Sequence, residues 1–182
     1  MAAKQKRIIL GVTGSIAAYK SADLIRRLVE KGFRVSVVMT KEAEHFITPL
    51  TLSSLSNEKV FGGLFDKWDD HFSMPHITLA QEADVLLIAP ATANIIGKLA
   101  HGIADNLLTC IALATKAPIL IAPAMNTEMY HNTIVQQNCR DLKKHGMRVI
   151  DPVEGKLACG TTGEGHIAEE STIIEAVMKA IR

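Results

Sequence analysis

The sequence has no excess of charge of either sign. Lys and Arg total 20 and Asp and Glu total 19, so the formal net charge is +1 at pH 7. A protein whose main partner is nucleic acid or an anionic membrane usually carries a basic surplus. The balance therefore argues against nucleic acid and against a membrane surface as main partners.

The sequence also lacks an apolar run long enough to cross a bilayer, which takes about 20 residues. Its longest runs are of the kind "VLLIAPA" and "APILIAPAM". The basic start "MAAKQKR" leads into an apolar segment of only strand length, which does not fit a targeting signal. We expect a cytoplasmic protein.

Cysteine is scarce, and no two cysteines are closely spaced. Cys110, Cys139 and Cys159 form no Cys-x-x-Cys pair, which argues against a disulfide framework and against a zinc site. The seven histidines show no metal-ligand spacing, so we expect no metal. We expect Cys110 and Cys139 to be core or half-buried residues. A functional cysteine would act as a thiol.

Apolar residues, by contrast, are plentiful. They make up 48% of the 182 residues, and the mean hydropathy is +0.17. A chain of this length buries about two thirds of its unfolded surface. No linker, low-complexity tract or repeat divides it, so we expect one domain over residues 1–182.

Short runs of Val, Ile and Leu alternate with amphipathic segments, which is typical of a parallel sheet covered on both faces. Strands are expected at residues 7–12, 34–40, 84–90, 118–124 and 147–150. Helices are expected before a stop at Gly32 and over residues 48–56, 76–83, 91–102, 105–116, 132–146 and 171–182. The fold class predicted is α/β, a single doubly wound parallel sheet.

Ligands of such sheets bind beyond the carboxyl ends of the strands, near the switch point of the strand order. Glycines at positions 11 and 14, with Ser15, lie in the first such turn and suit a phosphate. Their G-x-x-G-S spacing matches neither common nucleotide fingerprint and favours a mononucleotide, although a tight turn alone could require the glycine. Thr40, Thr92 and Asn94 add hydroxyl and amide groups after neighbouring strands.

Two further residues are candidates for proton transfer. His76 follows Pro75 at the start of a helical pattern, where it is either catalytic or an ordinary capping residue. Cys159 lies in "GKLACGTTGEGH", whose four glycines predict a mobile segment, either a surface loop or a lid that excludes water. A thiol in a lid would be a proton donor or a nucleophile.

Five segments taken together resemble one family. They are "GVTGSIAAYK", "HITLA", "APATANIIGKLAHGIADNLLT", "PAMNTEMYHN" and "KLACGTTGEGH". The chain resembles the homo-oligomeric flavin-containing cysteine decarboxylases, from about Arg7 to the terminal helix. The P-x-M-N-x-x-M pattern is specific when it occurs with the A-C-G segment, and "LACG" favours the branch that serves coenzyme A biosynthesis over the peptidyl-cysteine decarboxylases.

The resemblance implies a flavodoxin-like three-layer subunit that binds FMN. It implies a homotrimer, or a dodecamer of trimers, with active sites between subunits. The implied reaction converts 4'-phosphopantothenoyl-L-cysteine to 4'-phosphopantetheine. In that reaction FMN oxidises the cysteine moiety, the thioaldehyde loses CO2 to give an ene-thiol, and the hydride returns from the flavin while Cys159 supplies a proton.

The resemblance also implies roles for individual residues. His76 and Cys159 would be catalytic, with His76 managing the thiol proton, and Asn126 and Met129 would contact the substrate. The FMN-binding residues would be Gly14, Ser15, Ile16, Thr40 and Ser53 on the phosphate side, Thr92, Ala93, Asn94 and Ile95 around the flavin, and Ala124 at the strand end beneath it. An amide suits the carboxylate that leaves as CO2, because it donates hydrogen bonds without a full charge that would stabilise the ionised ground state.

One position departs from the family pattern. His166 follows Gly165 where a common version of the segment has arginine, so the residues that hold the substrate phosphate are not assigned. Two other functions remain open at this point: a flavin prenyltransferase, which shares the fold, and a regulatory subunit that binds a phosphatase.

Overall fold

A computed structural model describes residues 5–65, 74–156, 160 and 162–181. Its centre is a parallel sheet of six strands in the order β3-β2-β1-β4-β5-β6. The strands are β1 Arg7–Val12, β2 Arg34–Met39, β3 Val60–Phe61, β4 Val85–Ala91, β5 Ile119–Pro123 and β6 Arg148–Val149. Apart from the two-residue edge strand β3, this is the strand order of flavodoxin-like proteins, with its switch point between β1 and β4.

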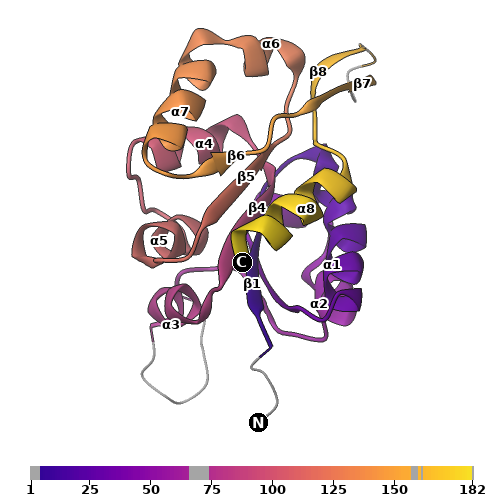
Figure 1. The fold of residues 1–182 in the computed structure, drawn as a ribbon, viewed down its shortest axis with the longest axis vertical. Coiled ribbons are helices and arrows are strands. Elements are labelled where there is room, and N and C mark those ends of the chain that lie inside the picture. The colour runs from indigo at the N-terminus through magenta and orange to yellow at the C-terminus, as the bar shows by residue number, and fades with distance from the viewer. Residues whose placement is uncertain (1–4, 66–73, 157–159, 161, 182) are drawn as a thin grey trace.

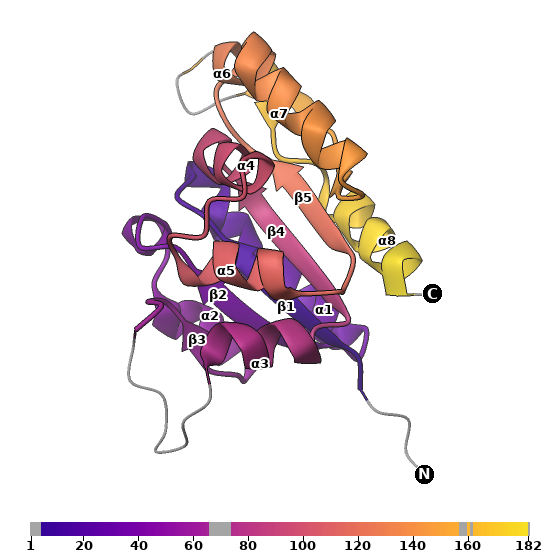
Figure 2. The same cartoon turned by 90° about the vertical axis from the view of Figure 1, so that its left-hand side faces the viewer.

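Helices cover both faces of the sheet. They are α1 Lys20–Glu30, α2 Pro49–Ser56, α3 Pro75–Glu82, α4 Ala93–Ala100, α5 Leu107–Ala114, α6 Thr127–His131, α7 Thr133–Lys144 and α8 Glu170–Ile181, with short 3-10 helices η1 Ile16–Tyr19 and η2 Ala43–His45. Figure 1 draws α1 and α2 on one side of the sheet and α3 and α5 on the other. Figure 2 looks onto the face that α3, α4 and α5 cover.

The central strands are buried on both faces, which explains their continuous apolar sequences. Ile8 and Leu10 of β1 pack in the core layer that includes α1, α2 and α8, whereas Ile9 packs in the layer that includes α3, α4, α5 and α7. Both layers also contain residues of β4, such as Leu87 and Leu86 respectively. This confirms the predicted α/β three-layer arrangement, since alternate residues of a strand point to opposite faces.

The predicted elements occur close to their expected positions, and the differences are local. The edge strand β3 and the five-residue helix α6 were not predicted. The glycine-rich segment was expected to be a surface loop or a lid, with no strands, and its described arms, β7 Val153–Lys156 and β8 Thr162–His166, pair as an antiparallel hairpin. Glycine is unfavourable in strands on propensity alone, which is why the sequence pattern did not indicate this hairpin.

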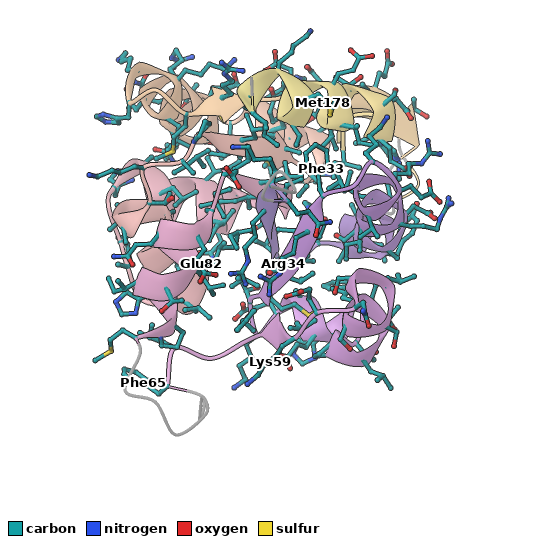
Figure 3. All side chains as sticks on the ribbon, turned by 60° about the horizontal axis from the view of Figure 1, so that its bottom comes forward. Phe33, Arg34, Lys59, Phe65, Glu82 and Met178 are labelled. Atoms are coloured by element: carbon teal, nitrogen blue, oxygen red, sulfur yellow. The ribbon has the colours of Figure 1, made fainter. Side chains whose placement is uncertain are left out.

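Charged side chains gather at the amino ends of the sheet strands. Arg7 is nearly buried there, donates from Nε to Ser36 Oγ at 3.0 Å and pairs with Glu82 of α3. Arg34 pairs with Glu58 at 2.8 Å. Figure 3 looks at this end and labels Arg34 and Glu82. Burial lowers the pKa of Arg7, so these partners compensate a desolvated cation.

Among the described residues, no helix has both the length and the apolar character that a bilayer crossing requires.

Replacing Thr48 by alanine is expected to lower the free energy of unfolding by about 1 kcal/mol, because the Thr48 hydroxyl caps α2 by accepting the backbone N–H of Thr51 at 3.2 Å. Urea unfolding measures the change. The matched control is Ser54→Ala, which removes an exposed hydroxyl that donates to the Leu50 carbonyl at 2.8 Å on the same helix and keeps the cap, so its effect should stay within about 0.5 kcal/mol. Equal losses in the two variants would show that the cap is not the cause.

Candidate functional site

A cavity of about 720 Å³ lies at the carboxyl ends of the strands around the switch point. Its walls come from the segments that follow β1, β4 and β5 and from the end of β8. Apolar side chains such as Ile16, Met125 and Met129 form much of its surface. A cavity of this size and character fits an organic ligand with a flat apolar part.

A smaller cavity of about 130 Å³ adjoins the first, and Gly14 and Thr92 line both. Its other lining residues include the polar side chains of Thr13, Thr40 and Asn94. It is therefore suited to a compact polar group of a ligand whose larger part lies in the first cavity.

The loops of the two switch-point strands are joined by one threonine hydroxyl. Thr13, which follows β1, donates from Oγ1 to the Pro90 carbonyl at 2.7 Å and accepts the backbone N–H of Thr92 at 3.1 Å. Thr13 is 1% exposed, so water does not compete for these bonds. The bridge fixes the spacing between the two walls that the cavities share.

The turn after β1 requires a glycine at position 14. A Cβ there would lie 2.5 Å from the Cβ of Glu42, so a larger residue would displace one wall of the smaller cavity. Ser15 then caps η1 by accepting the backbone N–H of Ala17 at 3.3 Å. Gly14 thus lets the backbone of this turn form part of the wall of both cavities.

Asn126 projects from the segment between β5 and α6, and the start of α6 fixes the orientation of its amide. Its Oδ1 accepts the backbone N–H of Glu128 at 2.9 Å and that of Met129 at 3.4 Å. Asn126 lines the larger cavity. Since this cap uses Oδ1 as an acceptor, Nδ2 is the donor end of the amide. The arrangement suits an anionic acceptor such as a carboxylate.

The β8 arm of the hairpin is fastened to this segment. The Gly165 carbonyl accepts the Met125 N–H at 3.0 Å, and His131 Nε2 lies 2.8 Å from a carboxylate oxygen of Glu164. Figure 1 draws the hairpin beside α6, at the end of the subunit where the strands finish. A side chain would prevent this approach, since a Cβ on Gly165 would lie 2.3 Å from the Met125 carbonyl oxygen.

The structure brings most of the predicted site residues together. Gly14, Ser15, Ile16, Thr92, Ala93, Ala124, Asn126 and Met129 line the larger cavity, and Thr40, Asn94 and Ile95 line the smaller one with Gly14 and Thr92. Their roles toward a ligand remain predictions. Cys159 lies outside the described residues.

Two predicted site residues line neither cavity. Ser53 lies on α2, where its hydroxyl donates to the Leu50 carbonyl at 3.0 Å. His76 lies on α3, and Figures 1 and 2 draw α3 and α6 at opposite ends of the subunit. The Nδ1 atom of His76 is buried and has no hydrogen-bond partner among the described residues. A single subunit therefore does not unite His76 with Asn126.

Several residues of the cavity walls were not predicted. Tyr19, Lys20 and His166 line the larger cavity, and Lys98 and Asn106 line the smaller one. The sequence could have indicated Lys20, because it follows the glycine turn closely and is the first residue of a helix that begins at the carboxyl ends of the strands. Asn106 forms a capping box with Thr109 at the start of α5, a pattern that the sequence shows directly.

Burial shifts the pKa of two side chains, one on α6 and one on α7, further from neutral pH. Burial raises the pKa of Tyr130 to about 12 and raises the pKa of the Cys139 thiol, which is buried in the core as predicted. Cys110 is half-buried, also as predicted. Within the described part of the chain, no three His, Cys, Asp or Glu side chains gather in a way that could hold a metal ion.

Comparison with known proteins identifies the family. A sequence model described as "Flavoprotein" matches residues 1–182. The chain belongs to the flavoprotein family. Membership agrees with the geometry, because a flavin has a flat apolar ring for the larger cavity. A flavin cofactor is the ligand that the family implies.

Among curated relatives, a probable phosphopantothenoylcysteine decarboxylase of Streptococcus mutans is 49% identical over 174 residues, which cover 94% of this chain and 97% of that protein. The coenzyme A biosynthesis bifunctional protein CoaBC of Vibrio vulnificus is 47% identical over 169 residues. That match covers 93% of this chain and 42% of the Vibrio protein, so the chain spans less than half the length of that relative.

Solved structures agree with the fold. A mutant PPC decarboxylase complexed with pantothenoylaminoethenethiol is similar with a TM-score of 0.89 and 36% identity, covering 97% of this chain and 98% of that one. The FMN binding protein AtHal3 is similar with a TM-score of 0.84 and 36% identity, covering 97% of this chain and 96% of that one.

Gly165→Ala is expected to loosen the attachment of β8 to the Asn126 segment. Gly165 has φ +139°, a backbone conformation that residues with a side chain rarely adopt. An added Cβ would also collide with the Met125 carbonyl oxygen. We expect the opening free energy of the Met125 amide, measured by hydrogen exchange, to fall by about 1–3 kcal/mol. Gly102→Ala is the control, because Gly102 has φ +66° with nothing within 4 Å. Unchanged exchange at Met125 in Gly165→Ala would refute this role.

Proposed function

We propose that this chain catalyses the FMN-dependent decarboxylation of 4'-phosphopantothenoyl-L-cysteine to 4'-phosphopantetheine, a step of coenzyme A biosynthesis. The observation that carries the proposal is the place of Asn126, which caps α6 through Oδ1 and lines a cavity large enough for a flat ring and an organic acid. The names of the Streptococcus and Vibrio relatives support the same reaction. We also propose a cytoplasmic location, as the sequence analysis predicts.

The residues present fit FMN. The apolar walls of the larger cavity, with Thr92, Ala93 and Ala124, would hold the flavin ring, and Gly14, Thr40 and Asn94 of the smaller cavity would hold its phosphate. The glycine at position 14 supports this, because a Cβ there would close the space between the walls. When bound, the flavin supplies two-electron chemistry by accepting a hydride from the carbon that bears sulfur and later returning it.

Asn126 holds the substrate carboxylate in this mechanism. Its amide donates a hydrogen bond from Nδ2 without adding a positive charge, so the carboxylate is oriented but its ionised form is not strongly favoured over CO2. Met129 lies one turn later on α6 and lines the same cavity, where it packs against apolar parts of the ligand. The protein's part in decarboxylation is therefore to orient the leaving group in an apolar surrounding.

His76 manages the proton of the substrate thiol, and a neighbouring subunit supplies it. Large apolar side chains are exposed at the start of α3 and on the helix α5 that packs against it: Met74 is 66% exposed, Ile77 40% exposed and Leu113 53% exposed. Such a patch suits burial against another copy of the chain. A homotrimer with each site between two subunits would bring His76 of one copy to Asn126 of the next.

Mixing two inactive variants tests this shared site. His76→Asn removes the proton-transfer group, and Asn126→Asp keeps the cap of α6 but replaces the amide donor by a carboxylate that repels the substrate. Each variant alone should release almost no CO2. Co-expressed in equal amounts, they should recover about a quarter of the native activity, because that share of randomly assembled sites has both native residues.

Mixed assemblies no more active than either parent would require both residues from one chain and would contradict the shared site. Native protein co-expressed with an inactive partner in the same ratio provides the control for assembly.

Cys159 is proposed as the acid that protonates the ene-thiol. The holoprotein with Cys159→Ser should still release CO2 but accumulate the ene-thiol, with loss of the flavin absorbance near 450 nm, because the proton needed for the last step is missing. Mass spectrometry of the product measures the change. We expect about 10²-fold less 4'-phosphopantetheine than the native holoprotein forms. Cys110→Ser is the matched control. Normal formation of 4'-phosphopantetheine by the Cys159 variant would exclude the acid role.

A further inference from the structure

Two basic side chains line the larger cavity, and the proposed chemistry uses neither. Lys20 begins α1, and His166 ends β8. Among the described residues that line this cavity, no acidic side chain accompanies them. The cavity therefore carries uncompensated positive charge on one part of its wall.

The charge of Lys20 is not neutralised by a partner within the described part of the chain. No hydrogen bond or ion pair links its amine to those residues, whereas Lys98 of the smaller cavity lies 2.6 Å from Asp105. Glu170 lines a narrow space of about 10 Å³ together with Lys20, but its carboxylate lies 2.7 Å from Arg27. Lys20 is therefore a half-buried residue with no counter-ion among the described residues, which favours binding of an anion.

His166 is held beside Lys20 with one ring nitrogen already engaged. Its Nδ1 lies 3.1 Å from the Ile167 carbonyl oxygen, and since a carbonyl only accepts, Nδ1 carries the hydrogen. Nε2 can then donate to an anion in the imidazolium form. Ile167 lines the same narrow space as Lys20, which places Lys20 and the His166–Ile167 stretch along one wall.

We propose that Lys20 and His166 form the subsite that receives the terminal phosphate of the substrate; this rests on the function proposed above. A full cation paired with the carboxylate would stabilise the charged ground state and oppose loss of CO2, so the phosphate is the substrate anion that suits these two side chains. The flavin phosphate has its own polar cavity, with Gly14, Thr40 and Lys98. A phosphate dianion is a strong ligand for a lysine amine and an imidazolium.

Binding of product and of its dephosphorylated form to the flavin-loaded full chain tests the subsite without turnover. Isothermal titration with 4'-phosphopantetheine and with pantetheine is compared for the native protein and for Lys20→Met. Loss of one charge-assisted contact should weaken 4'-phosphopantetheine by about 10- to 100-fold and leave pantetheine unchanged. The control, Lys31→Met, makes the same substitution at the other end of α1 and should change neither. His166→Gln should act in the same direction as Lys20→Met.

Three results would overturn the subsite. They are equal affinity of the native protein for the two ligands, equal weakening of both ligands by Lys20→Met, and loss of flavin from that variant, which would assign Lys20 to the cofactor phosphate. If Lys20→Met does not fold, His166→Gln with the same two ligands decides. Failure of the native holoprotein to release CO2 would contradict the proposed function instead, and the binding preference would still be measured.

Discussion

The whole site depends on the buried hydroxyl of Thr13, which joins the loops of the two strands on either side of the switch point. By donating to Pro90 and accepting from Thr92, it holds the end of β1 against the end of β4. The two cavities meet there, since Gly14 and Thr92 line both. A ligand with an apolar ring and a polar tail can therefore lie across one rigid junction, and the rest of the site is arranged around it.

A second constraint sets the chemistry. The start of α6 fixes the carbonyl end of the Asn126 amide, and β8 is fastened to the same segment through the close approach of Gly165 to Met125. The same side chain thus caps a helix and directs a donor into the cavity. In the proposed reaction the neutral amide of Asn126 would bind the leaving carboxylate, and Lys20 and His166 of the same cavity would bind the phosphate.

Much of this could be predicted from the sequence, and the reason is physical. Continuous apolar runs and N-cap residues such as Thr48 depend on local rules, so the sheet, its helices and the loops at the strand ends followed from them. The β7–β8 hairpin did not, because its glycines are required by contacts with Met125 and Thr127, which are distant in sequence. Lys20 was also missed, since its role depends on which segments form the opposite wall. The separation of His76 from Asn126 could not be predicted, because it depends on how α3 and α6 are placed in the fold and not on local sequence.

The most direct test of the central claim is a crystal structure of the assembled protein grown with FMN. We predict flavin density with the ring against Thr92, Ala93 and Ala124 and the phosphate beside Gly14 and Thr40, and His76 of a neighbouring subunit near the same ring. Flavin bound elsewhere, or an assembly in which no copy of His76 approaches Asn126, would contradict the decarboxylase site described above.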